Sequence, residues 1–262
     1  RETASGRVGS NKERPTMKTL VAALCFLLAG FARADGARCI MRGVCELDGV
    51  KGACPYDGQP QAIEDPEALE LLRGLCGDVF GNDTQAFCCD AGQVQDFHEN
   101  LQSAVVLGLD NCPACSVNFR TLICSMTCSP RQSDFLRLVR TALNEEEKAY
   151  VADIEYYLTP NFVHGMFNSC VDSRSRIPSI PLLNFMCGRW AQNCTAERWL
   201  GFVGATPEKG GLSPFGVTYV QVTQPQVVEG TTYSPLPAEP HQCNESRGRV
   251  SACSCEHCKA AC

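Results

Sequence analysis

The sequence has few of the side chains on which catalysis depends. It contains four histidines, His98, His164, His241 and His257, and no Gly-x-Ser-x-Gly motif that would present a nucleophilic serine. Covalent catalysis normally needs a nucleophile beside a histidine or another base. His98 lies next to the buried face of a predicted helix, where we expect it to be solvated. We therefore predict that the chain is not an enzyme and has no cofactor.

Basic side chains are also few once the first 34 residues are set aside. These residues hold six of the 23 Lys and Arg residues and two of the 29 Asp and Glu residues, which leaves 17 basic against 27 acidic side chains. This negative balance argues against nucleic acid or an anionic membrane surface as a partner. It suits an acidic lumen, where partial protonation would reduce self-repulsion.

No apolar run after residue 34 approaches the roughly 20 residues that a membrane-spanning helix needs. An earlier run, residues 20–31, follows Lys18 and precedes the small-x-small sequence Ala32-Arg33-Ala34. These are the three parts of a secretory signal, and the run is too short to cross about 30 Å of hydrocarbon. We expect residues 17–34 to be a signal peptide and residues 1–16 to be a non-native or untranslated-like extension. Because the chain opens on arginine and stops on cysteine, we also expect it to be part of a longer protein.

Cysteine, by contrast, is abundant. Of the 19 cysteines, all except Cys25 follow residue 34. So many cysteines persist as disulfides only in an oxidising compartment, since cytosolic thiol buffers keep thiols reduced. The even remainder predicts up to nine disulfides and a location outside the cytosol.

Three Asn-x-Ser/Thr sequons begin at Asn82, Asn193 and Asn244. In a secreted chain, sequons predict glycosylated surface positions. The cysteine inside the second sequon would slow its modification, so Asn82 and Asn244 are the better candidates.

Hydrophobic periodicity predicts more helix than strand. Asp65-Pro66-Glu67 is a typical helix start, and Thr195 is a typical N-cap. The predicted helices cover residues 65–75, 91–109, 113–124, 145–157, 161–170 and 195–200, and a strand is predicted over 215–222. The fold class is therefore α+β, a compact disulfide-rich domain of mostly helices with a small mixed sheet.

The last part of the chain has a different composition. Residues 224–242 are rich in proline and hold no cysteine, which predicts an extended surface loop. Cysteines cluster again in residues 243–262. This tail is either a separate mini-domain or a segment bound back onto the body.

Two cysteine patterns allow a chemical role. Cys112-Pro-Ala-Cys115 has the spacing of a thiol-disulfide oxidoreductase, but no βαβ unit surrounds it, and chance spacing among structural disulfides is favoured. Candidate zinc ligands are Cys253, Cys255, His257 and Cys258. Residues so close in sequence do not easily reach one tetrahedral site, so we predict no metal site.

The predicted helix over 91–109 carries amides on an otherwise apolar face. Gln93, Phe97, Asn100 and Leu101 fall on one side at helical spacing. A buried amide without a partner costs about 1–3 kcal/mol, so these amides need partners. Either they cap neighbouring backbone, or they bind the polar end of a ligand that is otherwise hydrocarbon, such as a sterol.

Several cysteine motifs resemble a known family. They are Cys88-Cys89 followed by Gln93, Cys112-Pro-Ala-Cys115, the run Cys124-Ser-Met-Thr-Cys128-Ser-Pro-Arg-Gln-Ser133, and Cys253-Ser-Cys-x-x-Cys-x-x-x-Cys262. Together they resemble the luminal N-terminal domain of the Niemann-Pick type C membrane sterol transporters, either the founding transporter or its "like" paralogue. The resemblance covers Cys39 to Cys262, and it marks residues 35–262 as one sterol-binding N-terminal domain.

The resemblance implies a domain that binds one cholesterol or oxysterol and performs no chemistry on it. It also implies a disulfide pairing: Cys39–Cys88, Cys45–Cys54, Cys76–Cys124, Cys89–Cys128, Cys112–Cys253, Cys115–Cys170, Cys187–Cys194, Cys243–Cys258 and Cys255–Cys262. In this pairing the Cys112 bridge binds the tail to the body, and the CxxC cysteines are not bonded to each other.

The family buries the sterol 3-hydroxyl group deepest, against side-chain amides, and leaves the aliphatic tail towards the entrance. By position the resemblance assigns the following residues to the pocket: Gln93, Phe97, Asn100, Leu101, Thr121, Ile123, Met41, Pro214, Phe215 and Val217. Ala53 stands where one branch of the family has a second hydroxyl-binding asparagine, and Met41 replaces a tryptophan. Phe185, Met186 and Trp190 occupy the rim where sterol passes between carriers.

The implied function is uptake of a sterol and its transfer to a membrane transporter. The implied partners are a sterol, a soluble luminal carrier and the membrane portion of the same protein. The location would be the lumen of the late endosome or lysosome, or the cell surface and endosome for the "like" paralogue. The alternatives are a folate- or riboflavin-type vitamin-binding module, which needs stacked aromatics such as Trp190 and Trp199, and the thiol-disulfide oxidoreductase.

Overall fold

The computed structural model describes residues 36–47, 50–81, 83–176 and 179–262. The expected extension, the signal peptide and Asn82 lie outside these residues. Residues 37–262 form one compact unit, and only this unit is described below.

Helices and strands are both numerous and short. The α-helices are α2 (Pro66–Phe80), α3 (Ala91–Leu107), α4 (Pro113–Cys128), α5 (Gln132–Phe135), α6 (Pro160–Cys170), α7 (Leu183–Met186) and α8 (Ala196–Val203). The 3-10 helices are η1 (Leu109–Asn111), η2 (Gly188–Asn193), η3 (Pro207–Lys209) and η4 (Lys259–Ala261). The strands are β1 (Cys39–Leu47), β2 (Val50–Gly58), β3 (Leu136–Leu143), β4 (Ala149–Leu158), β5 (Gly216–Gln221), β6 (Gln226–Val228) and β7 (Thr231–Tyr233).

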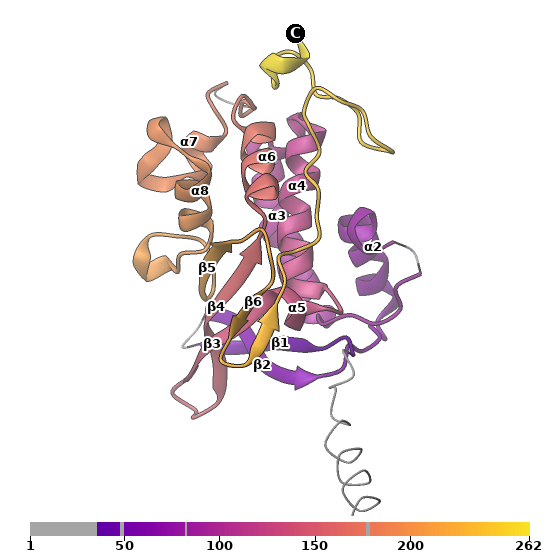
Figure 1. Ribbon diagram of the computed structural model, residues 1–262, viewed down its shortest axis with the longest axis vertical. Coiled ribbons are helices and arrows are strands. Elements are labelled where there is room, and N and C mark those ends of the chain that lie inside the picture. Colours follow the sequence, from indigo (N-terminus) through magenta and orange to yellow (C-terminus); the bar gives the residue numbers. More distant parts are fainter. Residues whose placement is uncertain (1–35, 48–49, 82, 177–178) are drawn as a thin grey trace, which may run out of the picture. The chain divides into compact units, whose positions relative to one another are not determined.

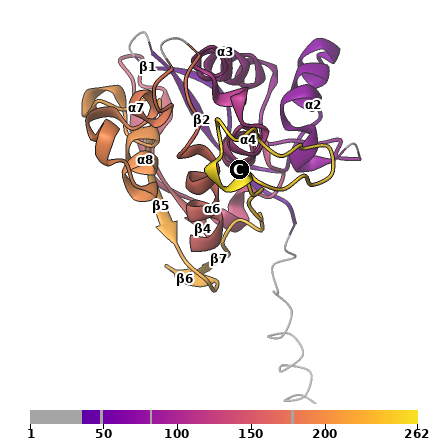
Figure 2. The ribbon, with the colours of Figure 1, turned by 90° about the horizontal axis from the view of Figure 1, so that it is seen from above.

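The central sheet has the order β3-β4-β5, with β4 antiparallel to β3 and parallel to β5. The β1–β2 hairpin packs against β4, and α4 lies in contact with α2 and α6. Figure 1 shows α7 and α8 on the side of β5 and α2 on the opposite side, and Figure 2 shows the same arrangement from above. The predicted α+β class with a small mixed sheet is confirmed.

Most predicted elements form where expected. Asp65 caps α2 by accepting hydrogen bonds from Glu67 N and Ala68 N, and Thr195 caps α8 by accepting one from Arg198 N. Helix α3 ends at Leu107 because Gly108 adopts a left-handed conformation that closes the last turn. The strand expected over 215–222 is β5.

One predicted element is wrong. Residues 145–157 were expected to be helical, but they form the turn after β3 and most of β4. Ile154, Tyr156 and Leu158 lie on one face of β4 and are buried, and Tyr157 on the other face is buried as well, so other elements cover both faces of this end of the strand. The β1–β2 hairpin and β3 were not predicted at all. Glycines interrupt the sequences of β1 and β2, and two arginines interrupt the apolar residues of β3; β3 is a strand because it pairs with β4.

The nine disulfides are those that the resemblance implies, and they include all 18 cysteines of the described residues. Cys112 is bonded to Cys253, 141 residues away, and Cys115 is bonded to Cys170. All four of these residues are buried. The oxidoreductase interpretation of the CxxC motif is therefore wrong, because neither thiol is free or bonded to the other.

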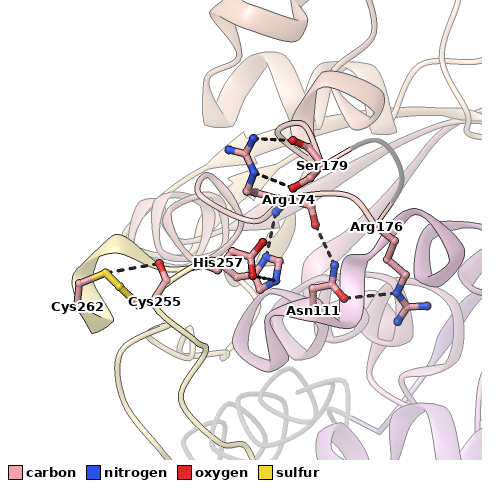
Figure 3. A network of polar contacts seen from close by, with 8 residues as sticks. Asn111, Arg174, Arg176, Ser179, Cys255, His257 and Cys262 are labelled. Atoms are coloured by element: carbon pink, nitrogen blue, oxygen red, sulfur yellow. Dashed lines mark hydrogen bonds and ion pairs between the residues drawn. A yellow bond between two sulfur atoms is a disulfide. The ribbon is translucent and has the colours of Figure 1, made fainter.

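The tail is held to the body by polar contacts as well as by disulfides. Figure 3 shows the backbone N–H of Arg174 donating to His257 Nδ1 at 3.2 Å, while Asn111 Nδ2 donates to the carbonyl oxygen of Arg174 at 2.9 Å. Lys259 forms an ion pair with Asp172 at 2.9 Å. The possible zinc ligands are used otherwise: the three cysteines are in disulfides, and His257 accepts from Arg174.

Residues 224–242 are more ordered than the loop predicted for them. They contain the β6–β7 hairpin, and they bury Leu236 and Pro240. Pro240 lies directly on α6, where a Cβ atom on Gly165 would be 2.3 Å from the proline Cγ. The segment is therefore packed against the helices.

A single buried amide binds this segment to α4. Asn118 is 1% exposed; its Oδ1 accepts from His241 N at 2.8 Å, and its Nδ2 donates to His241 O at 2.9 Å and to Ser169 Oγ at 3.0 Å. We expect Asn118→Ala to lower the free energy of unfolding by about 2 kcal/mol, because it leaves the backbone groups of His241 unpaired. Urea denaturation measures this. Asn168→Ala, at an exposed position of α6, should have little effect; equal effects of the two variants would contradict the prediction.

His241 should make stability depend on pH. Burial first, and then the positive charge of Arg247, lower the pKa of its imidazole below 6.5, while Asp78 acts in the opposite direction. Protonation therefore favours the unfolded chain, so the free energy of unfolding decreases as pH falls through 6.5 towards the lower folded-state pKa. We expect His241→Gln, which stays neutral, to show a smaller decrease between about pH 7.5 and about pH 5 in urea denaturation. Identical decreases would exclude this role.

Candidate functional site

Gln93 takes part in the cap at the start of α3. Asp90 Oδ1 accepts from Gln93 N at 2.9 Å, and Gln93 Oε1 accepts from Asp90 N at 3.2 Å. This reciprocal capping box satisfies two backbone N–H groups that the helix itself cannot pair. One of the two interpretations of the helix amides, capping of backbone, is thus correct for the oxygen of Gln93.

The same oxygen accepts a second hydrogen bond, from the backbone of β1. Gly43 N donates to Gln93 Oε1 at 2.7 Å. Gly43 has φ of +89°, and the pairing of β1 with β2 is irregular between Met41 and Val44. The irregularity turns the Gly43 N–H out of the β1–β2 ladder and towards α3, which fixes the orientation of the Gln93 side chain.

The geometry leaves the Gln93 Nε2 group as a donor. The backbone N–H groups of Gly43 and Asp90 both donate to the same atom of the Gln93 carboxamide. Only an oxygen can accept these bonds, so this atom is Oε1 and the remaining atom is Nε2. Within the described part of the chain, Nε2 has no hydrogen-bond partner, although the residue is only 8% exposed. Nε2 is not among the fully buried unpaired side-chain atoms of the described residues, so it is accessible. An accessible N–H₂ group held in one orientation is suited to bind an acceptor oxygen of a ligand.

Six of the expected pocket residues are buried apolar side chains. Met41 on β1, Ala53 on β2, and Phe97 and Leu101 on α3 are buried in the same apolar cluster as Phe215 and Val217. Phe97 and Leu101 follow Gln93 by four and eight residues, so they share its helix face. Six of the expected pocket residues thus belong to the apolar core of the domain, which extends over most of its elements; Gln93 is buried but is not one of the apolar residues of that core.

The other expected pocket residues do not join this buried group. Asn100 is exposed and its Nδ2 donates to Asp96 O, and Pro214 is exposed. The Thr121 hydroxyl donates to Val117 O within α4, and Ile123 is half-buried against the core. The Thr121 hydroxyl has no donor to spare for a ligand, and the second N–H of Asn100 is on an exposed side chain outside the buried group.

A buried amide that sequence reasoning missed is Gln132. It is fully buried; its Oε1 accepts from Ile40 N at 3.0 Å and Met41 N at 3.3 Å, and its Nε2 donates to Met126 O and Thr127 O at 2.9 Å. Because all its polar atoms are paired, Gln132 positions Met41 and has no donor left for a ligand. The only signal in the sequence was its place in the Ser-Pro-Arg-Gln-Ser133 motif.

Two tyrosines that were also missed lie beside the β5 wall. Tyr156 is fully buried, its hydroxyl donates to Leu122 O at 3.1 Å, and its ring stacks on Phe135 at 5.7 Å. Tyr219 lies opposite it on β5, with ring centroids 5.9 Å apart. Burial raises the pKa of both phenols well above the ordinary value of 10, so both stay neutral hydrogen-bonding groups.

The expected transfer rim is exposed only in part. Phe185 and Trp190 are 39% and 37% exposed, whereas Met186 is buried, so the expected three-residue patch is reduced to two aromatic residues. Arg189 and Arg198 lie over the Trp190 ring, 4.9 and 4.3 Å from its centroid. The Cys187–Cys194 disulfide closes this loop.

Two of the predicted glycosylation sites are exposed. Asn193 lies next to this disulfide and Asn244 lies in the tail, so both are accessible for glycosylation.

Within the described ranges, no group of three or more metal-binding side chains occurs. Over the same residues, no helix combines the length and the hydropathy that crossing a bilayer requires.

A family model described as Niemann-Pick C1 N terminus matches residues 36–262. The chain belongs to this family. This confirms the resemblance drawn from the cysteine motifs.

Relatives of the Niemann-Pick C1 N-terminus family are named as transporters. A Sus scrofa protein named NPC intracellular cholesterol transporter 1 is 32% identical over 233 residues, which is 86% of this chain and 18% of that protein. The Homo sapiens NPC1-like intracellular cholesterol transporter 1 is 38% identical over 200 residues, 74% of this chain and 14% of that protein. A Drosophila melanogaster homolog 1b is 27% identical over 259 residues, 94% of this chain and 20% of that protein. The chain thus spans a fifth or less of the length of these relatives.

The aromatic residues of this Niemann-Pick C1 N-terminal domain do not suit a vitamin ring. Trp199 is 1% exposed and stacks on Phe119 at 5.9 Å. Trp190 is covered by two arginines. The Trp199 indole is therefore not available to stack on a flat polar heterocycle, which leaves Trp190 without an indole partner for such stacking.

Gly43 should be needed for the position of its N–H group. We expect Gly43→Ala to lower the free energy of unfolding by about 1–3 kcal/mol, because a residue with a Cβ is strained at its φ of +89°. A Cβ there would meet only ordinary contacts, 3.4 Å from Asp90 Oδ2, so the effect arises from the backbone. Gly74→Ala in α2, where nothing lies within 4 Å, should instead stabilise the protein. Chemical denaturation of both variants checks the opposite signs, and a neutral Gly43→Ala would contradict the assignment.

Proposed function

We propose that this domain is an extracytoplasmic sterol-binding module that takes up cholesterol or an oxysterol, buries its 3-hydroxyl group, and passes it to the membrane portion of the same protein. The names of the relatives, which describe cholesterol transporters, support a sterol as the ligand. The observation that carries the proposal is the oriented Nε2 donor of Gln93 beside an apolar core.

The chemistry of a sterol matches this arrangement. A sterol is a rigid hydrocarbon with one hydroxyl group, so its site needs an extended apolar wall and one polar contact. In this proposal Met41, Phe97 and Leu101 would form one wall and Phe215 and Val217 another; all five are buried in the apolar core. Gln93 supplies the polar contact.

The direction of the hydrogen bond follows from the partners of Gln93. Its Oε1 already accepts from two backbone N–H groups, so Nε2 donates and the sterol oxygen accepts. Ala53 offers no second amide. A 3-keto oxygen accepts a hydrogen bond as well as a hydroxyl oxygen does, so this site should tolerate a 3-keto sterol.

The exposed aromatic pair suits the transfer step. Phe185 and Trp190 lie on α7 and η2, and both elements contact α8, which in turn contacts β5. In our proposal the sterol tail points towards this rim, where a soluble luminal carrier or the membrane portion of the protein would receive it. The nine disulfides fit an oxidising lumen or the cell exterior. Late endosome, lysosome, or the cell surface and endosome are the compartments we propose.

Replacement of Gln93 tests the proposal directly. We expect Gln93→Met to bind labelled cholesterol about 10-fold more weakly than the unchanged domain, because one buried hydrogen bond to the sterol is lost. The free energy of unfolding should also decrease by about 1–2 kcal/mol, since the cap is lost as well. A binding isotherm and a urea denaturation curve separate the two effects.

Two controls define the outcome. Asp90→Ala weakens the same cap without touching Nε2, so it should lower stability but change cholesterol affinity by less than about 3-fold. A 3-keto sterol should bind the unchanged domain about as tightly as cholesterol. Unaltered affinity of Gln93→Met, or equal losses in both variants, would exclude Gln93 as the hydroxyl contact.

A further inference from the structure

Two of the nine disulfides differ from the rest in their exposure. The other seven bridges each contain at least one buried cysteine. Both cysteines of Cys45–Cys54 are half-buried, and both cysteines of Cys255–Cys262 are exposed. Thiol-disulfide exchange requires a thiolate to reach a sulfur atom, so accessible bridges exchange first and are the ones suited to a regulatory role.

The Cys45–Cys54 bridge lies at the irregular part of the β1–β2 hairpin. Residues 41 to 44 of β1 pair with residues 55 to 53 of β2, so β1 has one residue more over this stretch. An extra residue of this kind is a β-bulge, which bends a strand and turns a backbone group out of the ladder. Cys54 is the β2 residue that faces the bulge, and its bonding partner Cys45 follows the bulge on β1. The bridge therefore fixes where the bulge lies.

The Cys54 sulfur lies against Gly43, the bulge residue whose N–H orients Gln93. A Cβ on Gly43 would be 3.7 Å from Cys54 Sγ, which is van der Waals contact. Gly43 N donates to Gln93 Oε1 at 2.7 Å. The next residue, Val44, packs on the first turn of α3, where a Cβ on Gly92 would be 3.2 Å from the valine Cγ2. The bridge thus borders the segment of β1 that contacts the start of α3.

Reduction of this bridge would remove the covalent constraint on the bulge. A shift of one residue along β1 would return the Gly43 N–H to the ladder with β2 and turn it away from Gln93. Of the two N–H groups that now donate to Gln93 Oε1, only that of Asp90 would remain. The Gln93 N–H₂ group would then be held less firmly in one orientation, which raises the entropy lost on ligand binding.

The bridge contributes less to the overall fold than the long-range bridges do. Its sequence separation is 9, whereas the five bridges that join distant elements have separations of 39 to 141. A shorter loop restrains the unfolded chain less. An ion pair between Lys51 and Asp96, at 2.6 Å, also holds β2 to α3 without the bridge. We therefore expect a domain that lacks only Cys45–Cys54 to remain folded.

We propose that Cys45–Cys54 is a thiol-disulfide exchange site whose oxidised form holds Gln93 in the orientation that binds sterol. This inference rests on the proposed function. A dithiol reductant attacks one sulfur as a thiolate and forms a mixed disulfide, and its second thiol then displaces the cysteine. The reductant leaves as a disulfide, and Cys45 and Cys54 each gain one electron and one proton. The reduced domain binds sterol more weakly.

Removal of each accessible bridge tests the positioning role. Cys45→Ser/Cys54→Ser should bind labelled cholesterol about 5–10-fold more weakly than the unchanged domain, because one hydrogen-bond donor is no longer oriented. Cys255→Ser/Cys262→Ser is the matched control, since it removes an accessible bridge with a separation of 7; its affinity should change by less than about 2-fold. In the Gln93→Met background, loss of Cys45–Cys54 should have little further effect, because both changes act through one contact. Additive losses, or equal losses in the two bridge variants, would overturn the inference.

Reduction of the native domain gives a second readout that needs no substitution. Limited dithiothreitol, followed by iodoacetamide and mass spectrometry, should label Cys45, Cys54, Cys255 and Cys262 before the other cysteines. In the domain reduced to this stage, the Gly43 N–H should exchange with deuterium about 10-fold faster by NMR, since it has lost its acceptor. A Cys45–Cys54 bridge that stays oxidised until the buried bridges are reduced, or an unchanged exchange rate at Gly43, would also overturn the inference.

The two proposals fail on different measurements. An unchanged domain that does not bind cholesterol would contradict the proposed function. Binding by the unchanged domain, with the same affinity in Cys45→Ser/Cys54→Ser, would contradict this inference alone.

Discussion

Two glutamine side chains hydrogen-bond the backbone of β1, and the candidate site depends on them. Gln132 accepts from Ile40 N and Met41 N, and Gln93 accepts from Gly43 N. The strand is irregular over this stretch, so these N–H groups need partners beyond a continuous ladder. The carboxamides bind β1 to α5 and α3 at the same time, and they set where Met41 and the Gln93 donor lie.

This use of amides explains why the two glutamines have different roles. Gln132 has all its polar atoms paired and acts as a fixed support. The oxygen of Gln93 also accepts hydrogen bonds from backbone N–H groups, but its N–H₂ group remains available to a ligand. A residue that is both a helix cap and a ligand donor is held more rigidly than a side chain with the ligand role alone, which reduces the entropy lost on binding.

The disulfides provide the frame around this site. The Cys112–Cys253 bridge, the Asn118 contacts and the Lys259–Asp172 ion pair all hold the C-terminal part of the chain against the helices. Loops closed by disulfides lower the entropy of the unfolded chain, so a domain with short strands and short helices remains stable. Two arginines, Arg189 and Arg198, lie over Trp190 at the expected rim.

The sequence by itself indicated an oxidising, extracytoplasmic setting, and it determined the fold class and most helix positions. Caps such as Asp65 and Thr195, the even cysteine set and the apolar face of α3 are local or compositional signals that need no partner to be read. The resemblance to the family also implied the disulfide pairing. The spacing of the cysteines alone does not decide which of them are bonded to each other. Helical spacing placed Gln93, Phe97 and Leu101 on one helix face.

Only the tertiary structure decided what those residues contact. The segment 145–157 has the composition of a helix, but pairing with β3 and β5 makes it a strand. Asn100 and Thr121 have side chains suited to a pocket, but one faces solvent and the other bonds its own helix. Gln132, Tyr156 and Tyr219 are far from α3 in sequence, and their burial and their paired or unpaired polar atoms arise from long-range packing. A hydrogen bond depends on where its partner lies in space, and a one-dimensional pattern carries that information only for neighbours within a turn or a strand.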